Sequence, residues 1–129
     1  METDVAVENG ILFILDPSNR GAIVPDYRPG EVCGWTDSCV SVPTIADVDG
    51  NVTVSLDFED GQGGTRARSL VFEGSIETPG RRLAIVSIAM KRVLEIEVPG
   101  AAARLRVGVD DVDFPSAVSV TVLLSGTPG

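Results

Sequence analysis

The sequence predicts an all-β protein, an antiparallel β-sandwich of seven to eight strands with little or no helix. Its composition favours sheets, because 43% of the residues are apolar but only 5% are aromatic, which leaves mainly branched aliphatic side chains. Turn residues recur near positions 9, 50, 62, 80, 99 and 112, and no helical pattern between them is long enough for a parallel crossover. A chain of 129 residues has the length of one domain, so we expect residues 1–129 to form a single sandwich.

The first predicted strands flank an Asn-Gly pair. Asp4–Val7 alternates polar and apolar residues, and a denser apolar run follows at Ile11–Leu15. Asn9-Gly10 between them is typical of a hairpin turn and equally of a bulge that bends one long strand. Asp16-Pro17 ends the second strand, because proline donates no hydrogen bond to a sheet.

A long loop is predicted at 18–44. This segment lacks sustained periodicity and is interrupted by Pro25, Pro29, Gly30 and Pro43. Loops of this length in compact domains are uncommon and are often functional. The only tryptophan, Trp35, lies here, and it is either a partly exposed binding anchor or a lid over the core.

The rest of the chain reads as strands separated by turns. Ile45–Val48, the turn Asp49-Gly50-Asn51 and Val52–Phe58 are predicted to form a hairpin. The later predicted strands are Ser69–Glu77, Leu83–Ile88, Val93–Val98, Ala103–Val109 and Ala117–Leu124. In this arrangement the outward Arg104 and Arg106 are the expected cross-strand partners of Glu95 and Glu97.

The chemistry of the side chains argues against an enzyme. The chain has no histidine, so Ser-His and Cys-His nucleophilic catalysis are excluded. Neighbouring carboxylates such as Glu95 and Glu97 are better explained as a solvated strand face than as a glycosidase pair. We predict no catalytic residue and no cofactor.

No metal site is predicted either. Asp47, Asp49 and Gly50 resemble the start of a calcium-binding loop, but the glycine comes too early, and a turn explains the same residues. Cys33 and Cys39 are too few for a zinc site without carboxylate ligands. They are expected to be free thiols in a reducing cytosol, with a loop disulfide as the alternative in an oxidising compartment.

We expect a cytoplasmic protein. The longest apolar run, Ile11–Leu15, is far shorter than a membrane helix requires. The acidic start of the chain also lacks the basic flank and apolar stretch of a secretory signal.

The negative charge is concentrated in the first half of the chain. Residues 1–60 carry twelve carboxylates and two arginines, whereas residues 61–129 carry seven carboxylates and eight basic groups. Such a field repels phosphates and attracts cations, which predicts a basic protein partner and excludes nucleic acid and anionic membranes. The residues predicted to bind this partner are Trp35, Asp37, Asp57, Glu59 and Asp60.

The segment from Val71 to Asp110 contains the successive strands VFEGSIE, LAIVSIAMKR, VLEIEVPG and ARLRVGV with glycine and Pro-Gly turns, and Trp35-Thr36-Asp37 precedes it. In these features the chain resembles the core of the competence protein J family, small inhibitors of a DNA-entry nuclease. The resemblance implies a protein that blocks a nuclease, or an immunity protein to one. The alternatives from other classes are a structural or ligand-binding sandwich and, less favoured, a carboxylate-based hydrolase.

Overall fold

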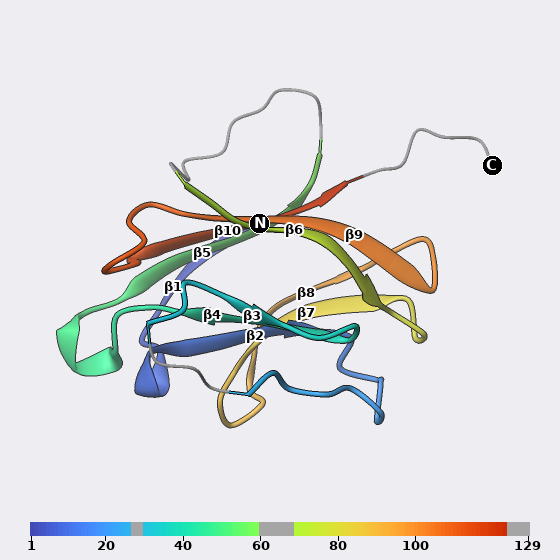
Figure 1. Ribbon diagram of the computed structural model, residues 1–129, viewed down its shortest axis with the longest axis horizontal. Coiled ribbons are helices and arrows are strands. Elements are labelled where there is room, and N and C mark those ends of the chain that lie inside the picture. Colours follow the sequence, from blue (N-terminus) through green and yellow to red (C-terminus); the bar gives the residue numbers. More distant parts are fainter. Residues whose placement is uncertain (27–29, 60–68, 124–129) are drawn as a thin grey trace.

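The structure is a computed structural model that describes residues 1–26, 30–59 and 69–123. Two β-sheets lie face to face, as Figure 1 shows, and helical structure in these residues is limited to two short 3-10 turns. The predicted all-β sandwich is therefore confirmed. In the described part of the chain, no helix is long and apolar enough to cross a membrane.

Each sheet contains five strands. The first has the spatial order β1 (Glu2–Val5), β5 (Val52–Phe58), β10 (Ala117–Leu123), β9 (Ala102–Val109) and β6 (Ser69–Glu77). The second has the order β3 (Gly34–Trp35), β4 (Cys39–Pro43), β2 (Ile11–Leu15), β7 (Arg82–Ser87) and β8 (Arg92–Glu97).

The sheets are antiparallel except at one pair. β10 runs parallel to β5, with Val118 opposite Val54, because β5 enters this sheet from β4 of the other sheet and not through a hairpin. Across the sandwich β4 contacts β6, whereas β8 contacts β1 and β5. The short strand β3 next to β4 therefore lies at the same edge as β6.

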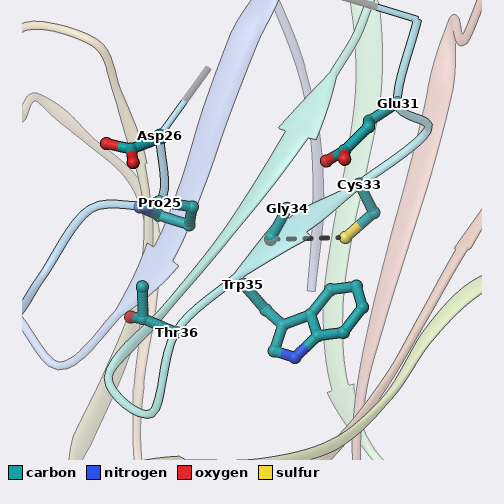
Figure 2. A pocket seen from close by; sticks show the side chains of 7 residues that line it. All are labelled: Pro25, Asp26, Glu31, Cys33, Gly34, Trp35 and Thr36. Carbon is teal, nitrogen blue, oxygen red and sulfur yellow. Dashed lines mark hydrogen bonds between the residues drawn. The ribbon is translucent and has the colours of Figure 1, made fainter. Parts of the chain in front are cut away.

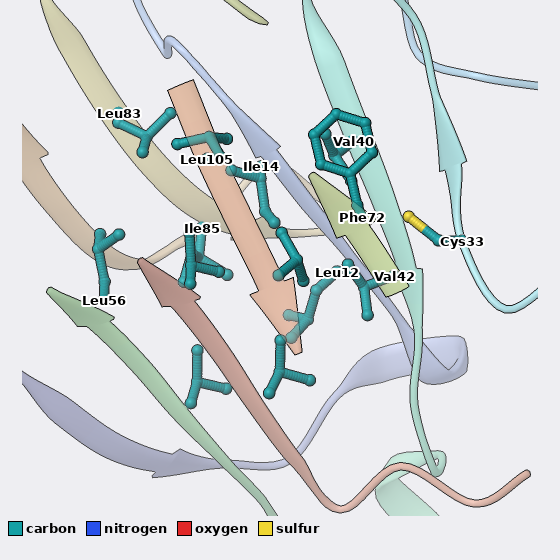
Figure 3. Packing of buried hydrophobic residues seen from close by; sticks show 14 of the residues in the cluster. Leu12, Ile14, Cys33, Val40, Val42, Leu56, Phe72, Leu83, Ile85 and Leu105 are labelled. Carbon is teal, nitrogen blue, oxygen red and sulfur yellow. The ribbon is translucent and has the colours of Figure 1, made fainter. Parts of the chain in front are cut away.

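The core fills the space between the sheets. Alternation on β5 places Val52, Val54 and Leu56 inward, as their spacing predicts. Figure 3 shows Leu12 and Ile14 of β2 and Leu105 of β9 within the same cluster. All of these side chains are buried, so strand alternation determines the face that each sheet turns to solvent.

The sandwich has more strands than the seven to eight predicted, because the segment 18–44 is not a continuous loop. β4 lies within it and pairs with β2, with Val40 opposite Ile14. β3 then pairs with β4 through Trp35 and Val40. Both strands are short, and β4 ends at Pro43, so their alternation is too brief to stand out from the prolines and glycines around them.

Two predicted turns change sheets instead of forming hairpins. The predicted strand Ile45–Val48 is wrong: a 3-10 turn at Asp47–Asp49 leads the chain from β4 to β5. Likewise, the 3-10 turn Glu8–Gly10 connects β1 in one sheet to β2 in the other, with Asn9 and Gly10 at positive φ. Asn-Gly thus fits the required backbone angles but makes neither a hairpin nor a bulge.

The predicted partnership of Glu95 and Glu97 with Arg104 and Arg106 is also wrong. β8 and β9 follow each other in sequence but lie in different sheets. Arg82 instead lies 2.6 Å from a carboxylate oxygen of Glu95. Arg106 lies 2.9 Å from a carboxylate oxygen of Glu73, on the neighbouring strand β6.

Candidate partner-binding site

A hollow of about 360 Å³ lies beside β3, at the edge of the sandwich. Figure 2 shows Glu31 and Cys33 on one side of it, and Pro25, Asp26 and Thr36 on the other. Its lining residues are Pro25, Asp26, Glu31, Cys33, Gly34, Trp35 and Thr36.

Trp35 is both exposed and supported. Its side chain is 63% exposed, a large fraction for the only tryptophan of the chain. Its ring centroid lies 5.8 Å from that of Phe72, with the ring planes tilted by 51°. Tilted aromatic pairs at this distance attract each other. The ring therefore rests against a core residue of β6 while most of its surface stays open to a partner.

Hydrogen bonds hold the backbone around this tryptophan. The hydroxyl of Thr36 donates to the main-chain oxygen of Ile23 (2.6 Å), and the amide of Ile23 donates to Oγ of Ser38 (2.7 Å). On the other side, the amide of Glu77 donates to the main-chain oxygen of Asp37 (2.8 Å). The Trp35 segment is thus tied to the preceding loop and to the end of β6, which fixes its backbone conformation.

The hollow carries negative charge. Asp26 and Glu31 line it, and the exposed Asp37 follows Thr36 in the chain. Among its lining residues that the structure describes, none is basic. Aromatic faces attract cations, and carboxylates pair with ammonium and guanidinium groups. The arrangement therefore suits a lysine or arginine side chain of a partner.

Cys33 lines the hollow and Cys39 begins β4, and both thiols have raised pKa values. The Cys33 thiol donates a long hydrogen bond to the main-chain oxygen of Gly34 (3.6 Å; Figure 2). Burial and the nearby Glu31 raise the pKa of Cys33 to about 12, and burial raises that of Cys39 to about 12. Both cysteines are free and buried, so neither supplies a thiolate nucleophile near neutral pH. The described ranges also contain no group of three or more His, Cys, Asp or Glu side chains placed to hold a metal ion.

The predicted binding residues do not form one cluster. Trp35 and Asp37 lie together at the β3 edge. Asp57 and Glu59 lie at the end of β5. Two strands, β10 and β9, lie between β5 and β6 in the sheet. Three strand spacings correspond to about 14 Å, so the two pairs occupy separate places. Asp57 is paired with the amino group of Met1, and Asp60 lies outside the described residues.

Sequence reasoning missed Asp26 and Glu31 as neighbours of Trp35. They precede it by nine and four residues in an irregular segment, where no periodicity relates sequence distance to position. The signal available was weak: two carboxylates and several prolines near the only tryptophan.

Two solved structures have a similar fold. One is ComJ from Bacillus subtilis, an inhibitor of the DNA-degrading activity of NucA, with a TM-score of 0.63 and 11% identity over 95% of this chain and 94% of that one. The other is the product of crocagin biosynthetic gene J, with a TM-score of 0.58 and 13% identity over 96% of each chain. No family model and no curated protein matches the sequence. Both superpositions span nearly the whole of each chain, so the chain has the fold of ComJ.

Proposed function

We propose that this protein binds a basic protein partner and inhibits a nuclease by doing so. The observation that carries the proposal is the exposed Trp35 held beside Asp26 and Glu31, on the fold of a nuclease inhibitor. In this proposal the protein acts in the cytoplasm, and it inhibits by binding alone, without catalysis.

Electrostatics gives this binding a mechanism. A nuclease needs a basic groove to hold the phosphates of its substrate. The excess of carboxylates in residues 1–60 attracts such a groove at long range and raises the association rate. A bound acidic protein then occupies the place of the nucleic acid, which is inhibition by exclusion.

The residues have separate roles in this proposal. Trp35 is the anchor, because tryptophan is one of the residue types enriched among interface hot spots. Asp26, Glu31 and Asp37 surround it and receive cationic side chains of the partner. Asp57 and Glu59 act from the end of β5, where rim charges mainly steer the approach, and Asp60 is proposed for the same role.

Affinity capture from the source organism tests the proposal. The full chain is immobilised and exposed to lysate at low and at high salt, and the eluted proteins are assayed for DNA degradation. We expect a basic nuclease to be enriched at low salt and to be lost at high salt, because salt screens exposed charges. Trp35→Ala should reduce the capture, whereas Leu70→Ala, which truncates an exposed apolar residue of β6, should not. Enrichment that is independent of salt, or a captured set without a nuclease, would overturn the proposal.

A second candidate function is a binding sandwich without an inhibitory role. It is favoured by the similar fold of the crocagin gene J product and by the hollow beside Trp35. In that case the captured partner keeps its activity when the chain is bound, so the same assay separates the two functions.

A further inference from the structure

Two loops form a second acidic surface at one end of the sandwich. One is the 3-10 turn Asp47–Asp49 between β4 and β5, and the other is the loop 110–116 between β9 and β10. The amide of Ile45, two residues before this turn, donates to the main-chain oxygen of Pro115 (2.9 Å) and so links the two connections. Figure 1 shows both loops projecting from the same end. We call the exposed residues of these loops the acidic tip: Asp47, Val48, Asp49, Asp111, Val112, Asp113 and Phe114.

The acidic tip exposes large apolar side chains. Val48 is 87% exposed and Phe114 is 72% exposed, the highest fractions among the large hydrophobic residues that the structure describes. Single exposed apolar residues are ordinary, but two on loops that are hydrogen-bonded to each other are a feature of binding surfaces.

The charge around these side chains is uncompensated. Asp47, Asp49, Asp111 and Asp113 are exposed, and within residues 1–26, 30–59 and 69–123 none of them is in an ion pair. Four carboxylates without an ion pair, on the same two loops as the exposed apolar side chains, attract cations and repel a second copy of the same surface. A homodimer through the tip is therefore disfavoured.

Hydrogen bonds fix the loop that carries Phe114. The Asp110 carboxylate accepts bonds from the amide (2.9 Å) and the hydroxyl (2.6 Å) of Ser116, and from the amide of Ala117 (3.0 Å). The Asp111 carboxylate accepts a bond from the amide of Asp113 (2.9 Å). Phe114 is thus held in solvent by an ordered loop, so binding there costs little conformational entropy.

The tip is a separate surface from the Trp35 hollow. It precedes β5, whereas Asp57 and Glu59 lie at the far end of this seven-residue strand, roughly 20 Å away. Trp35 pairs with Val40, near the start of β4, and the turn that carries Val48 follows the end of that strand. The tip and the hollow therefore share no residue and are carried by different loops.

We infer that the acidic tip is a second docking surface, which binds a basic protein surface that presents an apolar side chain among its lysines and arginines. The charge selects the basic partner, and Val48 and Phe114 supply the apolar contact. We take the partner to be the same basic nuclease, and this identity rests on the proposed function. The binding chemistry of the tip does not depend on it.

The binding chemistry is tested by titrating the isotope-labelled full chain with a synthetic peptide that alternates lysine and leucine. An all-lysine peptide of the same length is the matched probe. We expect the backbone amide signals of the two tip loops to shift first, and to saturate at lower concentrations of the lysine–leucine peptide than of the all-lysine peptide.

Phe114→Ala should weaken binding of the lysine–leucine peptide about tenfold, as for an interface hot spot. This variant should then bind the two peptides with similar affinity. The double reversal Asp49→Lys and Asp113→Lys should abolish binding of both peptides at the tip.

The controls separate this inference from the proposed function. Leu70→Ala and Trp35→Ala should leave the tip signals unchanged, because both residues lie on other surfaces. Amide signal shifts spread evenly over all acidic surfaces of the protein would overturn the inference. So would a Phe114→Ala variant that binds the lysine–leucine peptide as tightly as the wild type. With the captured nuclease as ligand, Phe114→Ala should also lower affinity. If the tip binds the peptide but not the nuclease, the proposed partner is wrong, whereas the inferred recognition of basic and apolar groups stands.

Discussion

The indole ring of Trp35 lies 5.8 Å, centroid to centroid, from the ring of Phe72, and the two differ sharply in exposure. Trp35 is 63% exposed, whereas Phe72 is only 9% exposed and belongs to the core cluster. The pair joins the edge strand β3 to β6 of the opposite sheet. A rigid core residue thus supports a side chain that is itself open to a partner.

Substituting each ring in turn should separate binding from stability. Trp35→Ala removes one aromatic contact and is expected to lower the free energy of unfolding by only about 1 kcal/mol. Phe72→Ala leaves a cavity in the core and should cost about 3–5 kcal/mol. Urea unfolding measures both. A loss of about 3 kcal/mol or more for Trp35→Ala would show that its ring is part of the core and would remove its interface role.

Gly80 should not tolerate a side chain. A Cβ atom there would lie 1.7 Å from Oγ of Ser18 and 2.9 Å from its Cβ. The Ser18 hydroxyl cannot simply rotate away, because it donates to the Asp16 carboxylate (2.6 Å). We expect Gly80→Ala to lower stability by about 1–3 kcal/mol in thermal or urea unfolding. Gly21→Ala is the control, since its Cβ would meet only Oδ1 of Asn19 at 3.5 Å; an equal effect of both substitutions would contradict the close packing at Gly80.

The buried Asp16 should make stability depend on acid pH. Burial raises the pKa of Asp16, but hydrogen bonds from Ser18 and Gly80 outweigh it and hold the pKa below the ordinary 3.8. A lowered folded pKa means that the ionised form stabilises the fold above pH 3.8 and that this contribution is lost as pH falls through the folded value. Melting temperatures between about pH 5 and pH 2 should therefore fall less steeply for Asp16→Asn than for the wild type. Parallel curves would assign the acid sensitivity to other groups.

Charge reversal at the predicted rim residues should change the rate of binding more than the lifetime of the complex. With Asp57, Glu59 and Asp60 all replaced by lysine, the association rate constant with the captured partner should fall and lose most of its salt dependence, because rim charges act on encounter. The dissociation rate and the melting temperature should change little. Surface plasmon resonance at several salt concentrations gives these rates. Unaltered association would place the contact elsewhere on the protein.

Local pattern predicted individual strands better than their partners. β2, β5 and β6 begin and end where alternation and turn residues indicate. Sheet membership was missed wherever the chain crosses between sheets, as at Asn9-Gly10 and at the 3-10 turn Asp47–Asp49. The same turn residues serve a hairpin and a crossover, and only packing of the whole core decides between them. The error about Arg104 and Glu95 has the same origin.

The candidate site was predictable only in part. The single tryptophan in an irregular segment drew attention to Trp35, but its exposure depends on the pairing of β3 with β4 and on support from Phe72. Asp26 and Glu31 reach the same hollow through loop geometry. Such geometry follows from tertiary hydrogen bonds, for example from Thr36 to Ile23, which no sequence period encodes.

The most direct test of the central claim is the rate of DNA degradation by the captured nuclease as the purified chain is added. We expect the wild-type chain to stop degradation at stoichiometric amounts at low salt and high salt to weaken this inhibition. Trp35→Ala should raise the required concentration by about tenfold or more. Degradation that continues at the same rate with the chain bound, or equal inhibition by the wild type and by Trp35→Ala, would contradict this claim.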